Sequence, residues 1–180
     1  HAPSQGQILL DGKAYCPSSP SDAQHRGVQT IFQQPALLPN LSVAENLCIG
    51  AWPFRHGRFL HVDWKAIYAQ AEESFCELGC RIDVHAAAQE LNLAQQRLVE
   101  LVKVSRSDAR VLIVDELDSV LTVQELAPVF RVLRSLRARG MSVLYISHRI
   151  ESLAELCDRV CIISEGQIKD TLDAGDPDSR

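Results

Sequence analysis

A run of apolar residues that ends in two adjacent acids constrains the fold of this chain most. Val111–Val114 is apolar and mostly β-branched, and Asp115 and Glu116 follow it directly. Such a run is typical of a strand that is buried on both faces of a parallel sheet. An unpaired charge is costly to bury. The two acids are therefore expected at the open carboxyl end of the strand, where α/β proteins bind their ligands.

The rest of the chain alternates between strand patterns and helix patterns. Strands are predicted at residues 6–12, 28–32, 111–114, 142–146 and 159–163. Helices are predicted from the caps Asp22, Ser42 (with Glu45 three residues on) and Asp63, and over residues 93–104, 125–139 and 151–157. The segment 51–62 fits neither pattern and is expected to be irregular. This alternation predicts an α/β fold with a mostly parallel sheet.

Length and charge narrow the class of protein. The chain has 180 residues, of which 46% are hydrophobic and 23% charged, which suits one globular domain with a packed core. A net charge of −5 argues against a nucleic-acid groove, so no nucleic-acid partner is expected. No apolar run is long enough to span a bilayer. The first residue is His1, without a leader-like segment after it, and we expect a piece of a longer chain.

The six cysteines offer a second, weaker pattern. Cys76–Cys80 and Cys157–Cys161 are spaced four residues apart, which on a helix places two thiols on one face, where they can bind a metal. The alternative is reduced, buried cysteines in a cytosolic protein. The second interpretation is preferred, because there is no C-x-x-C motif and no cluster of histidines.

Polar residues follow three of the predicted strands. Gln33 follows residues 28–32, Asp115 and Glu116 follow the central apolar run, and His148 follows residues 142–146. Each feature alone is weakly specific, but the ends of parallel strands meet at one edge of a sheet. A metal hydrolase that uses Asp115, Glu116 and His148 is one interpretation. It is disfavoured because no further His or Asp completes a ligand set at a usable spacing.

The order and spacing of these segments resemble the ATP-binding cassette (ABC) ATPase domain. The matching motifs are the Walker B strand (VLIVDE, 111–116), the Q-loop (IFQQ, 31–34), the H-loop (YISH, 145–148), the D-loop (SVLT, 119–122) and the LSGGQ-type signature (LNLAQQ, 91–96). The stretch QQRLVE at 95–100 is similar to the first nucleotide-binding domain of sugar-import ATPases. The resemblance covers nearly the whole chain.

This resemblance implies a P-loop NTPase-like, mostly parallel sheet with a helical subdomain, incomplete at the N-terminus. It assigns core strands and the Q-loop to residues 1–40, the helical subdomain and signature helix to 41–106, and the Walker B, D-loop and H-loop core to 107–180. No G-x-x-x-x-G-K-[ST] loop occurs in these residues. The resemblance places that loop upstream of the first strand, so the chain alone is expected to bind ATP very poorly.

The resemblance also implies roles for individual residues. Asp115 and Gln33 would hold Mg²⁺, and Gln33 would reach the attacking water as well. Glu116 would be the general base, and His148 would contact the γ-phosphate of ATP. Other nucleotide contacts would come from the signature at the start of a helix, whose amides favour anions, and from the D-loop: Asn92, Leu93, Ala94, Gln95 and Ser119.

The implied function is ATP hydrolysis that drives import, with a sugar as the cargo. Two cassettes, in the same chain or in a dimer, would enclose two ATP molecules, and transmembrane permease subunits would be the other partners. The protein would then lie peripherally on the cytoplasmic face of the inner (plasma) membrane. The alternative is a degenerate, non-catalytic cassette that only dimerises or docks.

Four departures from the family pattern bear on turnover. Ala94 stands where glycine is usual, and its Cβ would crowd a phosphate if the backbone needed a positive φ. Leu117 replaces the usual proline, which is expected to loosen the turn that aims Glu116. Asp118 adds a third acid, which would repel phosphates unless a cation offsets it. Asn92 replaces the usual serine of the signature but keeps a polar side chain.

Overall fold

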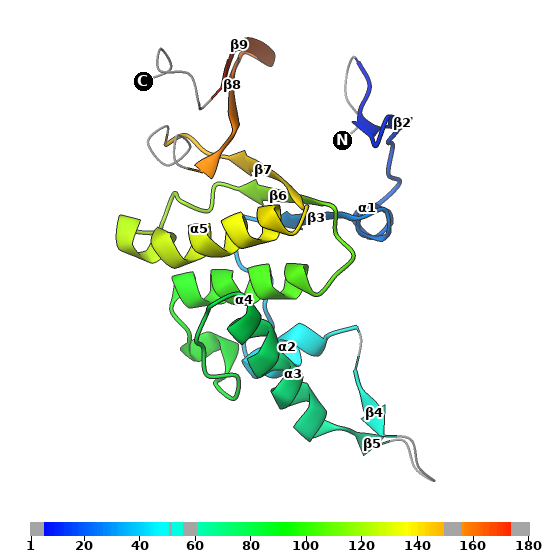
Figure 1. Cartoon of the computed structure of the whole chain (residues 1–180), viewed down its shortest axis with the longest axis vertical. Helices are drawn as coiled ribbons and strands as arrows, with labels where there is room; N and C mark the ends of the chain where they lie inside the picture. The colour runs from blue at the N-terminus through cyan, green and yellow to red at the C-terminus, as the bar shows by residue number, and fades with distance from the viewer. Residues whose placement is uncertain (1–5, 51, 56–60, 150–155, 174–180) are drawn as a thin grey trace.

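The computed structural model describes residues 6–50, 52–55, 61–149 and 156–173. Its centre is a three-stranded parallel sheet with the strand order β3-β6-β7 (Figure 1). The strands are β3 (Val28–Ile31), β6 (Val111–Asp115) and β7 (Ser142–Ile146). The strand that ends in Asp115 is the middle one, with β3 on one side and β7 on the other. The prediction of an α/β fold with a parallel sheet is confirmed.

Two helices cover one face of this sheet. They are α4 (Leu93–Ser105) and α5 (Val123–Ala138), which pack against β3 and β7, respectively, and against each other. Leu112 and Val114 of β6 are fully buried, as expected for a strand covered by helices. Burying this apolar surface, at roughly 25 cal/mol per Å², is the main force that joins the layers.

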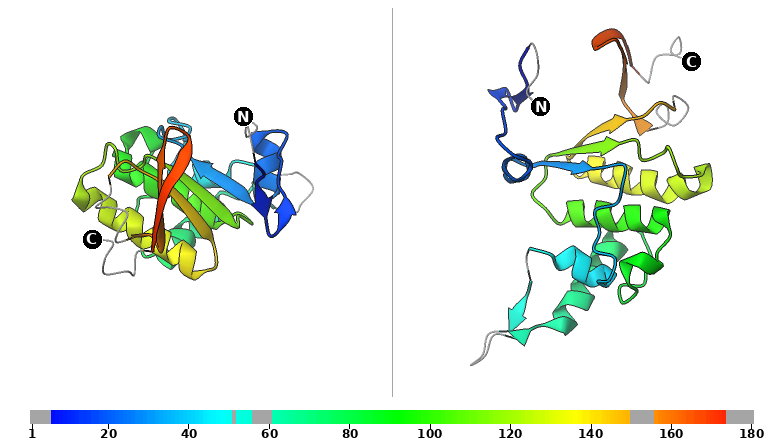
Figure 2. Two further views of the ribbon diagram at one scale, coloured as in Figure 1. Left: turned by 90° about the horizontal axis from the view of Figure 1, so that it is seen from above. Right: turned by 180° about the vertical axis from the view of Figure 1, so that it is seen from behind.

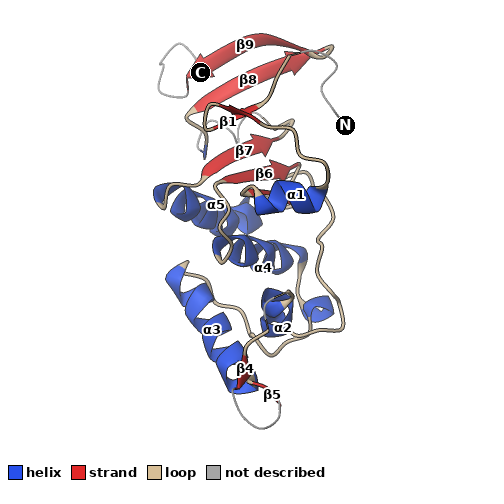
Figure 3. Cartoon of the chain, turned by 90° about the vertical axis from the view of Figure 1, so that its right-hand side faces the viewer, coloured by secondary structure: helices blue, strands red, loops and turns tan. Residues whose placement is uncertain are grey.

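Two further helices extend the molecule away from the sheet (Figure 3). They are α2 (Val43–Cys48) and α3 (Trp64–Glu77), which pack on each other, and α2 also packs on α4. Ser42 and Glu45 form a capping box at the start of α2, and the side chain of Asp63 caps α3. The sequence predicted both caps. Two shorter helical elements are α1 (Pro20–His25) and the 3₁₀ helix Ala88–Glu90.

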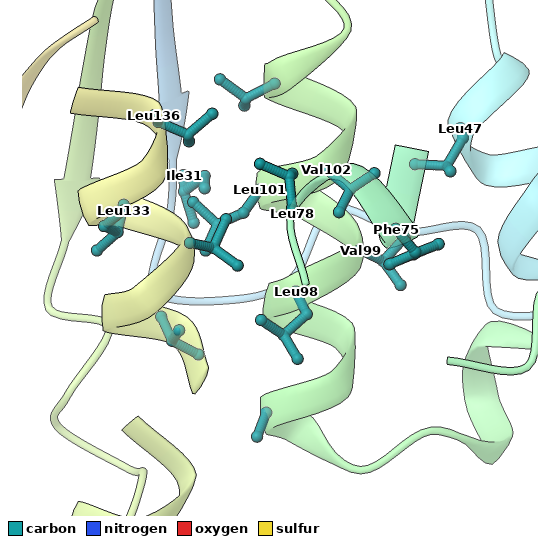
Figure 4. Packing of buried hydrophobic residues seen from close by; sticks show 14 of the residues in the cluster. Ile31, Leu47, Phe75, Leu78, Leu98, Val99, Leu101, Val102, Leu133 and Leu136 are labelled. Atoms are coloured by element: carbon teal, nitrogen blue, oxygen red, sulfur yellow. The ribbon is translucent and has the colours of Figure 1, made fainter. Parts of the chain in front are cut away.

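The buried hydrophobic residues form one cluster, with α4 at its middle (Figure 4). On one side of α4 lie Leu133 and Leu136 of α5 and Ile31 of β3. On the other side lies Phe75 of α3. Helix α4 therefore joins the sheet layer and the α2–α3 layer into one core.

Three antiparallel hairpins complete the described chain. They are β1–β2 (Leu9–Leu10 and Lys13–Ala14), β4–β5 (Phe54–Arg55 and His61–Val62) and β8–β9 (Arg159–Ser164 and Gln167–Asp173). Figures 1 and 2 show β1–β2 and β8–β9 on the side of the sheet opposite α5. On that side Leu144 and Ile146 of β7 are 55% and 45% exposed. Within the described residues, helices therefore cover the sheet on one face only.

Several predicted elements differ in the structure. The segment 159–163 is a strand as predicted, and it lies outside the parallel sheet because it pairs with β9 in an antiparallel hairpin. The segment 51–62 contains the short β4–β5 hairpin, although no pattern in the sequence indicated it. Helix α1 is capped by Ser19 and not by Asp22, because Pro20 fits the first helical position. The predicted helix 151–157 lies largely outside the described residues.

The cysteines are all free thiols. Cys48 is buried and Cys80 and Cys157 are half-buried, and burial raises the pKa of all three thiols, which favours the protonated form. The prediction of buried cysteines is wrong for the other three, which are exposed: Cys16, Cys76 and Cys161. Among the residues that the structure describes, no group of three or more His, Cys, Asp or Glu side chains is placed to hold a metal.

No helix in the described part of the chain is long and apolar enough to cross a membrane.

Candidate functional site

Three side chains that follow adjacent strands meet at the carboxyl edge of the sheet. The Gln33 amide Nε2 donates to Glu116 Oε2 over 3.4 Å, and His148 Nδ1 lies 3.8 Å from Glu116 Oε1. The side chains of Glu116 and His148 are 42% and 64% exposed, so a ligand in solution can reach them. We call Gln33, Glu116 and His148 the strand-end cluster. Parallel strand order brings these residues together across 115 positions of sequence.

The backbone of Glu116 is held in an unusual conformation. Its φ is +46°, in the left-handed region that a residue with a Cβ rarely adopts. Its N–H donates to Ile146 O over 3.0 Å, and its carbonyl oxygen accepts from the Ser119 hydroxyl over 2.8 Å. Strain of this kind persists only where the surroundings fix it, and it is frequent at functional sites. These bonds aim the carboxylate away from the strand and toward Gln33 and His148.

The turn after Glu116 keeps its shape without proline. Leu117 is fully buried in the core cluster and anchors the chain by its side chain. The Ser119 N–H also donates to Glu116 O over 3.3 Å. A buried leucine and two hydrogen bonds therefore restrain the turn, and the expected loosening by the loss of proline stays a prediction. Ser119 acts here as a local cap of the turn.

Asp118 does not lie among the groups that face solvent. Its side chain is fully buried, and Oδ2 accepts from the Ser147 hydroxyl over 2.6 Å. Burial and the nearby Asp118 charge together raise the pKa of the Tyr145 hydroxyl, with burial the larger cause. The expectation that Asp118 would stand close to phosphates as a third acid is thus corrected. Its carboxylate instead accepts a hydrogen bond in the interior of the protein.

Arg149 completes a set of bonds around His148. Its guanidinium Nη1 donates to Asp118 O over 3.1 Å and to Leu121 O over 3.4 Å. Its N–H donates to the Ser147 hydroxyl over 2.8 Å. The residues on both sides of His148 are therefore attached to the turn that carries Glu116. The sequence analysis missed this attachment. Its only signal was an acid at position 118, where the family usually has threonine.

Replacing Asp118 by Ala is expected to lower the free energy of unfolding of the full-length protein by about 1–3 kcal/mol, because the half-buried Ser147 hydroxyl loses its acceptor. Urea unfolding followed by circular dichroism measures the change. Asp118→Asn keeps an acceptor oxygen and should lose less. The exposed Asp108→Ala variant is the control. Equal stability of Asp118→Ala and Asp108→Ala would show that the buried bond is not a restraint.

Asp115 ends β6 beside the strand-end cluster. It is half-buried, and it pairs in register with Ile146 of β7. The Asp115 carboxylate and the side-chain carbonyl of Gln33 are hard oxygen ligands, the type that Mg²⁺ prefers. Mg²⁺ is commonly held by one or two carboxylates together with substrate phosphates. The donor set fits this ion in that manner, and a cage of three acidic side chains is not required.

The signature residues lie apart from this cluster, at the start of α4. Asn92 is the N-cap of the helix, and its Oδ1 accepts from the Gln95 N–H over 2.9 Å. The Gln95 side chain accepts from the Asn92 N–H over 3.0 Å, which completes a capping box. Leu93 is half-buried in the first turn. In the described part of the chain, no hydrogen bond joins these side chains to the strand-end cluster.

Ala94 fits its position without crowding. It lies inside α4 with helical backbone, and its side chain is 6% exposed and belongs to the core cluster. The positive-φ residues other than glycine that the structure describes are Asp11, Glu116 and Glu165, so Ala94 is not among them. The condition under which its Cβ would crowd a phosphate, a positive φ, is therefore not met in this conformation.

A buried ion pair in α4 contacts the loop that carries Gln33. Arg97 is fully buried, and its Nη1 donates to Phe32 O and to Glu100 Oε2, each over 2.7 Å. Its Nη2 donates to Gln33 O. Glu100 Oε1 accepts from the Ala36 N–H over 2.8 Å. Sequence analysis did not single out this pair, and its signal was two charges three residues apart on an otherwise apolar helix face.

Comparison with known proteins decides the family. A model of the family described as ABC transporter matches residues 1–119. This chain belongs to the ABC transporter family. This chain is 41% identical over 168 residues to "Ribose import ATP-binding protein RbsA 2" of Streptomyces avermitilis. The alignment covers 93% of this chain and 33% of that protein. It thus spans about a third of the length of such curated relatives.

Other relatives agree with this assignment. "Arabinose import ATP-binding protein AraG" of Vibrio parahaemolyticus is 36% identical over 173 residues, covering 96% of the ABC chain and 34% of that protein. A crystal structure of the ADP conformation of an ATP-binding cassette of an ABC transporter aligns with a TM-score of 0.77 and 22% identity. That alignment covers 94% of the ABC chain and 70% of the other. It supports the cassette fold.

Proposed function

We propose that this chain is part of the ATP-hydrolysing subunit of an importer for a sugar. The observation that carries the proposal is the meeting of Gln33, Glu116 and His148 within 4 Å at the ends of three neighbouring strands. The cargo class rests on the printed names of relatives, which are ribose, arabinose and ribose/galactose/methyl galactoside import proteins. ATP is the proposed substrate, and Mg²⁺ the proposed cofactor.

The geometry suits in-line attack of water on the γ-phosphate. Glu116 accepts the proton of the attacking water, and its strained backbone fixes where the carboxylate stands. Gln33 orients that water and holds the carboxylate by its amide. His148, on the other side of Glu116, donates to a γ-phosphate oxygen. Asp115 and Gln33 would hold Mg²⁺, which would supply neutralisation of negative charge at the phosphates.

The start of α4 serves a second cassette in this proposal. The capping box uses the N–H groups of Asn92 and Gln95, so the amides of Leu93 and Ala94 are the ones that this proposal gives to an anion such as the γ-phosphate of the partner's ATP, at the positive end of a 13-residue helix. In the same proposal Ser119, whose hydroxyl donates to Glu116 O, would also contact the second cassette. Closure of two cassettes would then move permease subunits, with the ATPase peripheral on the cytoplasmic face of the membrane.

The degenerate-cassette alternative is less well supported. A cassette that had lost hydrolysis would be free to lose the polar groups at its strand ends, yet Gln33, Glu116 and His148 are all present and in contact. Asp118, one of the departures that suggested this alternative, is fully buried and accepts from the Ser147 hydroxyl, so its carboxylate is not presented to solvent.

The test uses the full-length protein, assembled with its permease in lipid vesicles. ATP hydrolysis is measured with and without a panel of ribose, arabinose and galactose and the matching binding proteins. The proposal expects Mg²⁺-dependent hydrolysis that at least one sugar stimulates. Hydrolysis that no sugar affects would refute the cargo class. An assembled complex that hydrolyses no ATP would refute the ATPase role and favour the degenerate cassette.

A further inference from the structure

The loop after β3 is fastened to α4 by polar side chains. Arg97 donates to the carbonyl oxygens of Phe32 and Gln33, and Glu100 accepts from the N–H of Ala36. Arg97 and Glu100 are three residues apart, so they lie on one face of the helix and pair with each other over 2.7 Å. We call Arg97, Glu100 and these three backbone groups the α4–loop tie.

Holding α4 in the core does not require this tie. The same helix buries Leu98, Val99, Leu101 and Val102, which are at most 7% exposed. A buried ion pair contributes little net stability, because desolvation of the two charges offsets their attraction. The buried Nε of Arg97 has no hydrogen-bond partner within the described residues, which adds to that cost. The buried guanidinium of Arg97 is therefore better explained as a group that fixes the position of the loop than as one that stabilises the fold.

The tie fixes geometry in a way that apolar contacts do not. The planar guanidinium has donors at fixed angles, and here they reach two consecutive carbonyls, so the positions of two successive peptides, Phe32–Gln33 and Gln33–Gln34, are both restrained. Phe32 is itself 59% exposed, so its side chain does little to hold the loop.

The tie joins the two parts of the proposed ATPase site. Arg97 lies about one helical turn after Asn92–Gln95, the residues proposed to meet a partner's ATP. On the loop side it holds Gln33, whose side chain reaches Glu116 over 3.4 Å. A rigid helix and a short set of hydrogen bonds thus connect the start of α4 with the carboxylate proposed as the base. Such contiguous contacts can transmit a displacement.

We infer that Arg97 and Glu100 are positioning residues that make α4 and Gln33 move as one unit. This deepens the proposed function and rests on it: engagement of the α4 start by the partner's ATP would set Gln33, and through it Glu116, for hydrolysis. Neither residue touches the reacting atoms. The proposed hydrolysis step at Glu116 does not itself use Arg97, so the role of Arg97 is an addition to that step.

The test compares variants of the full-length protein. Arg97→Met alone would leave the Glu100 carboxylate buried without its partner, so the main variant is the double change Arg97→Met with Glu100→Leu. Arg97→Lys is the conservative variant, since one ammonium can reach one of the two carbonyls. Val102→Ala is the matched control, a fully buried apolar position on the same helix. Hydrogen exchange of the Ala36 amide and steady-state ATP hydrolysis are measured for each.

The double variant is expected to speed exchange at Ala36 and to lower kcat, each by about tenfold or more, with KM for ATP changed less than about threefold. Val102→Ala should lower Tm without changing either quantity, and Arg97→Lys should recover part of kcat. Native Ala36 exchange in the double variant, or an equal loss of kcat in Val102→Ala, would overturn the inference. If the wild-type protein hydrolyses no ATP, the proposed function fails, and Ala36 exchange alone decides whether the tie exists.

Discussion

Replacing Glu116 by Gln in the full-length protein is expected to lower kcat for ATP hydrolysis by about 10²- to 10⁴-fold, the usual effect of removing a general base. The two side chains have the same shape, so Gln at position 116 can still accept from Gln33 and fill the same space beside His148. ATP binding should therefore persist, and the variant should hold ATP without turning it over. Radiolabelled ATP retained after rapid gel filtration measures this directly.

Glu73→Gln is the matched control for this prediction. Glu73 is an exposed carboxylate on α3, on the far side of α4 from the sheet, and its loss should leave kcat within a factor of about two, as for most surface changes. If Glu116→Gln hydrolyses ATP as fast as Glu73→Gln, then Glu116 is not the base. The strained φ of +46° at this position would then need another explanation.

Replacing Phe75 by Ala is expected to cost about 3–5 kcal/mol of unfolding free energy, the range for truncating a buried aromatic side chain. Phe75 is 2% exposed and lies between α3 and the middle helix α4 (Figure 4). The loss should be large, because α4 belongs to a single core that also supports the sheet. Urea unfolding monitored by circular dichroism and by Trp fluorescence measures it.

Phe75→Leu is the control, since it keeps most of the apolar volume and should lose less than half as much. The two probes should also report one transition, because the α2–α3 layer and the sheet share the core cluster. A loss below about 1 kcal/mol for Phe75→Ala, or an early transition seen by one probe only, would show that the α2–α3 layer is a separate, weakly coupled unit.

The elements that periodicity and caps define could be predicted from the sequence. Helix α3 begins after Asp63, α4 begins near Leu93, and the strand before Asp115 is in the sheet as predicted. The start of α5 was two residues off, because Thr122 caps the helix and Glu125 completes its capping box from inside. These signals are local, so a single sequence contains them.

The contacts that tertiary structure alone creates could not be predicted. The Asp118 carboxylate was expected near phosphates, but it bonds to Ser147, 29 positions away, and lies inside the protein. Arg97 was given no role from the sequence, but it is buried and donates to Phe32 O and Gln33 O, more than 60 positions earlier. Burial of a charge depends on which loop lies opposite it, and hydrophobic periodicity does not carry that information.

The division of the chain at residues 40 and 106 stays a prediction. The structure does show that α4, assigned to the middle segment, packs on α5 and on β3 of the other two. One core cluster runs through all three segments. The three segments therefore fold together as parts of one unit, whichever boundaries are drawn within it.

The most direct test of the account is a crystal structure of the full-length Glu116→Gln protein with Mg²⁺ and ATP. The account predicts Asp115 and Gln33 at the metal, residue 116 within hydrogen-bond reach, about 2.6–3.2 Å, of a water in line with the γ-phosphate, and His148 on a γ-phosphate oxygen. It also predicts that the start of α4 meets the ATP of the second cassette. Nucleotide bound away from the ends of β3, β6 and β7, or residue 116 turned from the phosphates, would contradict it.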